Sequence, residues 1–333
     1  LTKLFSRTRH PVAGWFADVA AVPRTLSTGI DLSPLFIQGL PFLARHPEKW
    51  GEVIKVLYKT AFDPNENMRL LASAKAQRVV QEVPNIILGG GGAEFFAAAK
   101  PGGLLTRLAA KIPGGERILQ ETYGRGAAVF DTLGNWMRIE WADALLPTAR
   151  RAGGNARLDL GTLVNHATGV LSMTAMGVSP TQQAIEGGFL FFASRYLRSS
   201  LALVGDALGG GLKGSEARKS LGTMAVLGPL MYYKTCLLLD QEPIMDPGDS
   251  RMFTIQVGTE RIGIGTVWVA LARLLAKTAV NAQTGEWDFT QAFQFDSRNP
   301  LVQFWKGRTS ILTSAIWDTV SKETYLGDDL TQP

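Results

Sequence analysis

The chain has 333 residues, of which 46% are hydrophobic and 19% are charged, so it has enough apolar sequence for two or three cores and is not a disordered chain. Its net charge of +5 comes from 34 Lys+Arg against 29 Asp+Glu spread along the sequence, which argues against a dedicated nucleic-acid-binding domain, because such a domain clusters its basic residues. The only cysteine, Cys236, and three isolated histidines (His10, His46 and His166) exclude a disulfide framework and leave no metal-ligand spacing.

The N-terminal part of the chain has helical periodicity. An amphipathic helix is predicted from His46 to Ala61, ended by the Asp-Pro-Asn sequence at residues 63–65, and a polar, basic helix is predicted at 68–83. Four consecutive glycines follow at 89–92. We interpret them as a flexible loop, because the Lys-Ser/Thr pair that follows the glycines of a phosphate-binding loop is missing.

The central part of the chain predicts three long helices, at 116–146, 159–176 and 181–208. The third is apolar almost all round, which indicates a buried helix. The glycine-rich sequence at 209–215 lacks the order of a phosphate-binding loop and is predicted to link two helices.

Near the C-terminus, apolar and polar residues alternate at 252–257 and again at 261–264, separated by a short loop with Gly258. This pattern predicts an antiparallel hairpin whose inward face packs on the helix after Thr266.

That helix is predicted to end at 281–285. A last helix is predicted to begin at Asn299, which can cap it, with Pro300 in its first turn and one apolar stripe from Leu301 to Ile316.

The predicted fold is therefore mainly α, a multi-helix fold of the kind found in assemblies, with one small hairpin near 252–264. We expect an N-terminal helical region at 1–88, a central one at 93–208 and a C-terminal one with the hairpin at 215–333. Since the sequence does not begin with methionine, we also expect a fragment or processed part of a longer polypeptide.

The sequence predicts no catalytic, cofactor-binding or metal-binding residue. It contains no Gly-x-Ser-x-Gly elbow, His-Glu-x-x-His helix, Walker lysine or Cys/His nucleophile pair. Glu140 and Asp143 share a helix face, and Asp328 and Asp329 are adjacent, but acid-base catalysis requires a shaped pocket and not only closeness in sequence. Hence no small-molecule substrate is expected.

Two features leave alternatives open. Arg195 and Arg198 either extend their charged ends to solvent or form pairs at one end of their helix, or they contact a partner or phosphate. The apolar residues at 170–178 and 221–239 are too short or too polar to span a bilayer, which favours buried core helices over insertion. The alternative is that these helices lie on a bilayer after a conformational change. Five basic residues would then meet anionic headgroups: Arg195, Arg198, Lys213, Arg218 and Lys219.

The mean hydropathy of +0.06 and the many glycines within predicted helices indicate large contact surfaces with other chains or lipid. Small residues let helices approach one another closely. The glycines concerned are Gly124, Gly126, Gly134, Gly169 and Gly177. We therefore predict a ring or layered oligomer.

Short motifs along nearly the whole chain resemble, in the same order, a module of very large phage and prophage proteins, the large polyvalent proteins. The first motifs are Asp-x-Ser with Gln-Gly at 28–39, followed by His-Pro at 46–47. The central ones are Asn-x-Ala-Thr-Gly at 165–169 and Phe-x-x-Arg, followed by Tyr, at 192–196. The last ones are Arg-Ile-Gly-Ile at 261–264, Asn-Pro-Leu at 299–301 and Thr-Tyr-Leu-Gly-Asp-Asp-Leu at 324–330. The sequence departs from the module at Phe36-Ile37, where a basic residue is more common, and at Ser310, where proline is. No residue role is carried over.

The resemblance implies a non-catalytic internal virion protein of a tailed phage, a structural or conduit component of DNA ejection. Its partners would be copies of itself, other virion proteins of the portal or tail region, packaged DNA through non-specific contact, and the host membrane during infection. The protein would lie in the virion interior, and in the host envelope or cytoplasm after ejection. Two alternatives are an injected effector that inhibits a host defence system or enzyme, and an enzyme with an unrecognised site.

Overall fold

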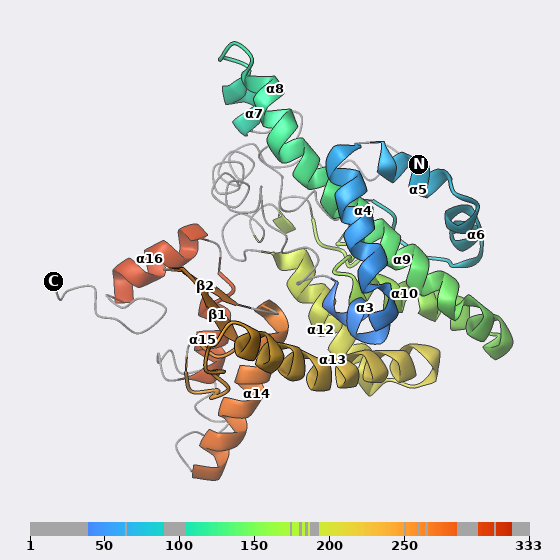
Figure 1. Cartoon of the computed structure of the whole chain (residues 1–333). Helices are drawn as coiled ribbons and strands as arrows, with labels where there is room; N and C mark the ends of the chain where they lie inside the picture. Colours follow the sequence, from blue (N-terminus) through green and yellow to red (C-terminus); the bar gives the residue numbers. More distant parts are fainter. Residues whose placement is uncertain are drawn as a thin grey trace. The chain divides into compact units, whose positions relative to one another are not determined.

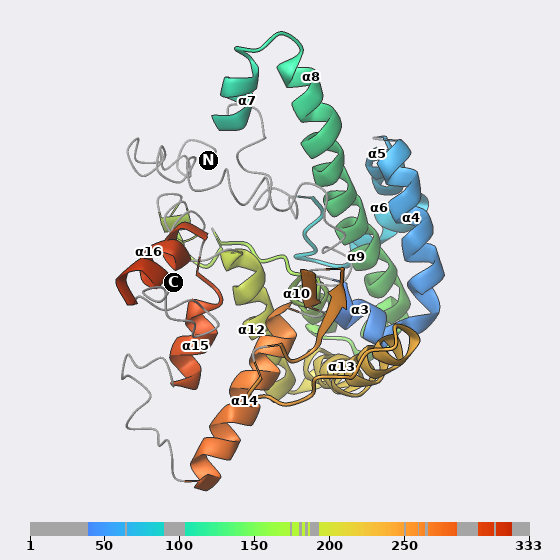
Figure 2. The same ribbon diagram turned by 60° about the vertical axis from the view of Figure 1, so that its left-hand side comes forward.

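The computed structural model (Figures 1 and 2) forms two compact units. Unit 1 comprises residues 1–188 and 193–225, and unit 2 comprises 189–192 and 226–333. This division differs from the three regions predicted at 1–88, 93–208 and 215–333. The structure describes residues 39–63, 65–89, 104–173, 175–179, 182–183, 186, 193–249, 251–258, 260–263, 266–284, 299–309 and 311–321.

The described N-terminal helices of unit 1 are short. They are α3 (Leu40–Arg45), the 3-10 helix η2 (Pro47–Lys49), α4 (Trp50–Phe62), α5 (Glu66–Ala72) and α6 (Ala74–Glu82). The amphipathic helix predicted from His46 is confirmed as η2 and α4. The single helix predicted at 68–83 is wrong, because Ser73 is extended and its Oγ accepts a hydrogen bond from Ala76 N at 3.2 Å, which begins a new helix there.

The central element of unit 1 is α9 (Arg125–Ala152), and Figure 1 shows α4 along one side of it. The short α7 (Leu104–Ala109), α8 (Gly115–Leu119) and the π-helical turn η3 (Gln120–Gly124) precede it. The predicted end at residue 146 is wrong, since α9 continues through Pro147. Leu146 and Ala149 are both buried there, and this burial favours the extra helical turn although Pro147 has no backbone N–H to donate.

Two further helices of unit 1, α10 (Ala156–Ala167) and α12 (Ser194–Leu208), pack on one another, and α10 also packs on α9. Both are shorter than predicted. The helix predicted at 159–176 ends at 167, because Gly169 has φ +77° and turns the chain away. The predicted helix 181–208 is confirmed over α12, whereas its apolar residues 189–192 lie outside the described residues.

The glycine-rich linker is confirmed, because α12 ends at Leu208 and α13 (Gly211–Leu238) begins three residues later. A Cβ at Gly214 would lie 2.1 Å from the carbonyl oxygen of Gly209, so this tight turn requires glycine. Residues 211–225 of α13 belong to unit 1 and its remaining residues belong to unit 2.

Close approach of a neighbouring backbone is found at Gly161, a glycine for which it was not predicted. Gly161 of α10 lies against the segment before Gly89, where an added Cβ would be 2.1 Å from the Pro84 carbonyl oxygen. For Gly134 the nearest group is the Arg138 side chain of its own helix, and nothing lies within 4 Å of a Cβ at Gly177. Neither of these two glycines therefore marks a helix contact.

In unit 2 the predicted hairpin is confirmed. Strands β1 (Thr254–Val257) and β2 (Glu260–Gly263) are antiparallel, with Ile255 opposite Ile262, and Gly258 has φ +63° in the connecting turn. The predicted packing on the helix after Thr266 is found at Val269 of α14, and α13 provides a further packing partner that was not predicted. The buried cluster contains Tyr232, Cys236, Met252, Phe253 and Ile255, packed against Val269.

The last described helices are α14 (Thr266–Thr284), α15 (Pro300–Lys306) and α16 (Ile311–Ser321). The predicted cap is confirmed, since Asn299 Oδ1 accepts from Leu301 N at 2.9 Å. The single stripe predicted from Leu301 to Ile316 is divided between α15 and α16 by a turn at 307–309. The predicted fold class, mainly α with one small hairpin, is confirmed.

Candidate functional site

A buried polar network at the C-terminal end of α10 is the first candidate site. Asn165 is 5% exposed and uses both ends of its amide: Oδ1 accepts from Ile87 N at 3.0 Å, and Nδ2 donates to the Asn85 carbonyl oxygen at 2.6 Å. Residues 85–87 belong to neither helix nor strand, so their backbone groups need such side-chain partners. Asn165 therefore fixes this segment on α10.

Arg138 of α9 extends the network and is fully buried. Its Nη2 donates to Asn135 Oδ1 at 2.8 Å and its Nη1 lies 3.5 Å from Thr168 Oγ1. Burial lowers the pKa of Arg138 to about 10, partly offset by the charge of Asp131, so the guanidinium is still protonated at neutral pH. Asn135 also accepts from Gly89 N at 2.7 Å. The network thus holds the segment from Asn85 to Gly89, the first of the four glycines, at both of its ends.

A third part of the network joins three helices. His166 Nδ1 of α10 lies 2.6 Å from Asp206 Oδ2 of α12, and Lys213 Nζ of α13 lies 3.0 Å from Asp206 Oδ1. Burial would raise the pKa of the Asp206 carboxyl, but the hydrogen bonds from His166 and Lys213 hold that pKa below its ordinary value. Asp206 is consequently a carboxylate with two basic partners.

An imidazole oriented by a carboxylate is half of the arrangement that activates a nucleophile. The other half would be a hydroxyl or thiol within reach of the imidazole. Ser199 lies nearby, but its Oγ donates to the His166 carbonyl oxygen at 2.8 Å and so is used by the backbone. The described part of the chain also contains no group of three His, Cys, Asp or Glu side chains that could hold a metal ion. The network is suited to holding helices together.

Several charged residues singled out in the sequence form ion pairs with side chains elsewhere in unit 1. Glu140 lies 2.5 Å from Lys75 Nζ, and Asp143 lies 2.5 Å from Arg78 Nη2, so both carboxylates of α9 contact α6. Arg198 Nη2 donates to both oxygens of Glu186, at 2.8 and 2.9 Å. Asp328 and Asp329 lie outside the described residues.

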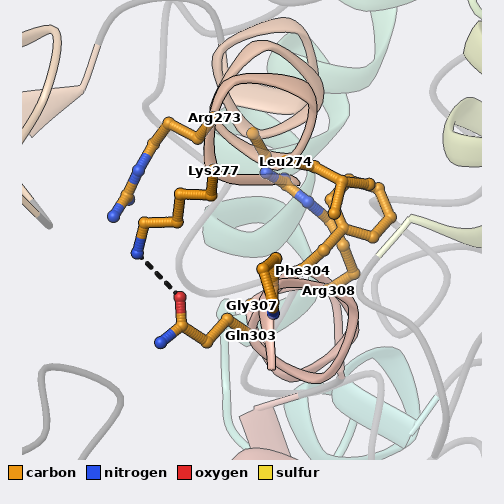
Figure 3. A pocket seen from close by; sticks show the side chains of 9 residues that line it. Arg273, Leu274, Lys277, Gln303, Phe304, Gly307 and Arg308 are labelled. Atoms are coloured by element: carbon orange, nitrogen blue, oxygen red, sulfur yellow. Dashed lines mark hydrogen bonds between the residues drawn. The ribbon is translucent and has the colours of Figure 1, made fainter. Parts of the chain in front are cut away.

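A second candidate site is a pocket of about 30 Å³ between α14 and α15 in unit 2. It is too small for a metabolite, because a single water molecule already needs roughly 10–15 Å³. Figure 3 shows two of its basic side chains, Arg273 and Lys277, directed to the same side, with Lys277 donating to Gln303 Oε1 at 2.8 Å. The residues that shape the pocket include Arg273, Leu274, Lys277, Gln303, Phe304 and Arg308.

The part of α13 in unit 2 exposes a row of apolar side chains. They are Val226, Leu230, Tyr233 and Leu237, with exposed fractions of 61%, 53%, 45% and 54%. Their spacing of four, three and four residues places them on one face of the helix, beside the face that buries Tyr232 and Cys236. The expectation that residues 221–239 are ordinary buried core is therefore wrong for this face, which we call the α13 stripe. Spanning a bilayer demands a long and strongly apolar helix, and no helix among the described residues meets that demand.

Comparisons of the chain with protein-family models, with curated proteins and with solved structures gave no match. The His166, Asp206 and Lys213 cluster was not predicted, because its members are far apart in sequence and lie on three helices. Only the Asn-x-Ala-Thr-Gly motif at 165–169 pointed to this region.

Proposed function

We propose that this chain is a non-catalytic internal virion protein of a tailed phage, packaged with the genome and ejected with it as a structural or conduit component. The proposal starts from the resemblance to large polyvalent proteins described above. Its partners would be copies of itself and other virion proteins of the portal or tail region, with non-specific contact to packaged DNA and contact with the host membrane during infection.

The observation that carries the proposal is the role of the residues in the Asn-x-Ala-Thr-Gly motif. Asn165 and Thr168 are buried and hydrogen-bonded, largely to backbone, and Gly169 adopts the positive φ that ends α10. Because this motif serves packing and the end of a helix, it supports membership of a family whose shared residues specify a fold. An enzyme family would instead place such residues around a substrate pocket.

The outward row of apolar side chains on α13 gives further support. Side chains of this kind suit a chain that functions within an assembly, because contiguous exposed apolar surface is a usual mark of a protein contact. A ring or layer of copies would cover it.

The deciding experiment is mass spectrometry of purified phage particles after nuclease and external protease treatment. An internal virion protein should survive the protease in intact particles and become sensitive once the DNA has been ejected. Absence of the chain from purified particles would overturn the proposal.

A deletion of the gene separates a conduit component from an injected effector. Without a conduit component, particles should adsorb normally but deliver less DNA to every host. Without an effector, DNA delivery should be normal and infection should fail only in hosts that carry the targeted defence.

A further inference from the structure

We propose that the outward face of α4 binds the surface of a bilayer that contains anionic lipids. Ile54, Tyr58 and Phe62 are 57%, 65% and 70% exposed, and their spacing of four residues places them in one row along the helix. We call these three residues the α4 row. Contact with the host membrane is part of the proposed function, on which this inference rests, and the α4 row would make that contact.

The opposite side of α4 is used within unit 1. Val53 and Thr60 are buried there, and α4 packs along α9, as Figure 2 shows. The helix is therefore held in unit 1 by one face while the α4 row remains in contact with water. Binding at the outward face would need no rearrangement of unit 1.

Basic side chains lie directly beside the α4 row. Lys55 and Lys59 are both exposed, and each follows a member of the row, so the two lysines run parallel to it along the helix. The only acidic residue of α4, Glu52, is paired with Lys49, whose Nζ lies 2.9 Å from its carboxylate. Within the described part of the chain, neither Lys55 nor Lys59 has an ion-pair partner. Two uncompensated positive charges thus adjoin an exposed apolar row.

This combination of side chains is the one that recognises an anionic bilayer. Helices that lie on a membrane bury apolar and aromatic residues at the boundary of headgroups and acyl chains, and their basic residues meet the anionic headgroups. Lys55 and Lys59 can direct their ammonium groups to the headgroups while their methylene chains stay beside the α4 row. Tyr58 and Phe62 stack with ring centroids 4.7 Å apart, and tyrosine rings are enriched at the membrane interface.

The test is co-sedimentation of the full chain with vesicles at low salt. The unaltered chain should bind vesicles of phosphatidylglycerol and phosphatidylcholine at least about tenfold more tightly than vesicles of phosphatidylcholine alone, and added salt should reduce the difference. Phe62→Ser should weaken binding about tenfold, since a buried phenyl ring is lost. Lys55→Gln combined with Lys59→Gln should weaken it about tenfold or more, because each lysine contributes about fivefold, whereas arginine at both positions should retain binding.

Matched control variants lie elsewhere in unit 1. Leu208→Ser removes a leucine that is 87% exposed at the end of α12, and Lys111→Gln removes an exposed lysine that follows α7. Both should bind vesicles like the unaltered chain. Equal weakening by the controls and the α4 variants, or no binding of the unaltered chain to millimolar anionic lipid, would overturn the proposed surface.

A second measurement locates the contact directly. Cys236 is the only cysteine and is buried, so Phe62→Cys and Lys111→Cys each provide one accessible thiol for an environment-sensitive fluorophore. Anionic vesicles should increase the fluorescence of the label at position 62 and leave the label at position 111 unchanged. A response at position 111 but not at 62 would place the contact elsewhere and overturn the assignment to α4.

The α4 surface and the proposed function fail in different experiments. If the chain is present inside phage particles but does not bind anionic vesicles, the α4 surface is wrong and the virion function stands. If the chain binds vesicles through Phe62 and the two lysines but is absent from particles, the surface stands and the virion function is wrong.

Discussion

Arg138 donates from Nη2 to Oδ1 of Asn135 across 2.8 Å, and both side chains are fully buried one turn apart on α9. Among the described residues no carboxylate accepts a hydrogen bond from Arg138, and its Nε has no partner. The C-terminal end of α10, where Thr168 lies, provides partial negative charge instead. The positive charge of Arg138 is thus buried in unit 1, and the described groups that contact it directly are neutral.

We predict that Arg138→Met changes the free energy of unfolding by less than about 1 kcal/mol or stabilises the protein, because methionine fills similar space without a buried charge. Asn135 Oδ1 would keep its bond from Gly89. Arg138→Ala should cost about 2–5 kcal/mol through the cavity it leaves. Urea denaturation followed by tryptophan fluorescence measures both. Equal destabilisation by the two variants would show that the charge itself is required.

Gly161 tests the close approach of α10 to the segment at residues 84–86. Alanine normally stabilises a helix over glycine by about 1 kcal/mol. Gly161→Ala should instead destabilise the protein by about 1–3 kcal/mol, because its Cβ would lie 2.1 Å from the Pro84 carbonyl oxygen. Gly205→Ala in α12 is the control. Nothing lies within 4 Å of a Cβ there, so it should be neutral or stabilising in the same denaturation assay.

His46 should make unit 1 sensitive to mild acid. Burial among Phe42 and Trp141 lowers the pKa of its imidazole, although the hydrogen bond to Glu48 opposes this. The folded protein therefore binds a proton at His46 less readily than the unfolded chain, whose histidine pKa is about 6.5. The stability contribution of His46 is present above that value and is lost as pH falls through the folded pKa.

We predict that His46→Phe flattens the dependence of unfolding free energy on pH between about 7 and 5. The phenyl ring should keep the aromatic contacts, and it removes a buried Nε2 that has no hydrogen-bond partner. Stability at neutral pH should therefore be retained. Denaturation curves at several pH values decide the matter, and an unchanged slope in this window would contradict the prediction.

The α13 stripe should mediate self-association. Its spacing is that of the a and d positions of a coiled coil, which favours another copy of the same helix as the partner. Leu230→Asp should weaken the oligomer by at least about tenfold, as for other central apolar contacts. Met231→Asp is the matched control, since Met231 is 48% exposed but lies on a different face. Sedimentation velocity measures both, and a monomeric unaltered chain would refute the prediction.

The sequence determined the elements whose signals are local. The hairpin at 254–263, the Asn299 cap of α15, the end of α4 at Asp63 and the linker before α13 follow from alternation, capping residues and glycines that act within a few positions. The predicted fold class follows from the same local patterns.

Tertiary structure decided what depends on partners distant in the sequence. Burial of Leu146 and Ala149 extends α9 through Pro147, and contact with Pro84 fixes Gly161, although neither effect has a local signal. The joining of His166 to Asp206 also arises only when separate helices pack. Helical periodicity shows that a face is apolar, but only packing determines which residue covers it, and the α13 stripe remains exposed for this reason.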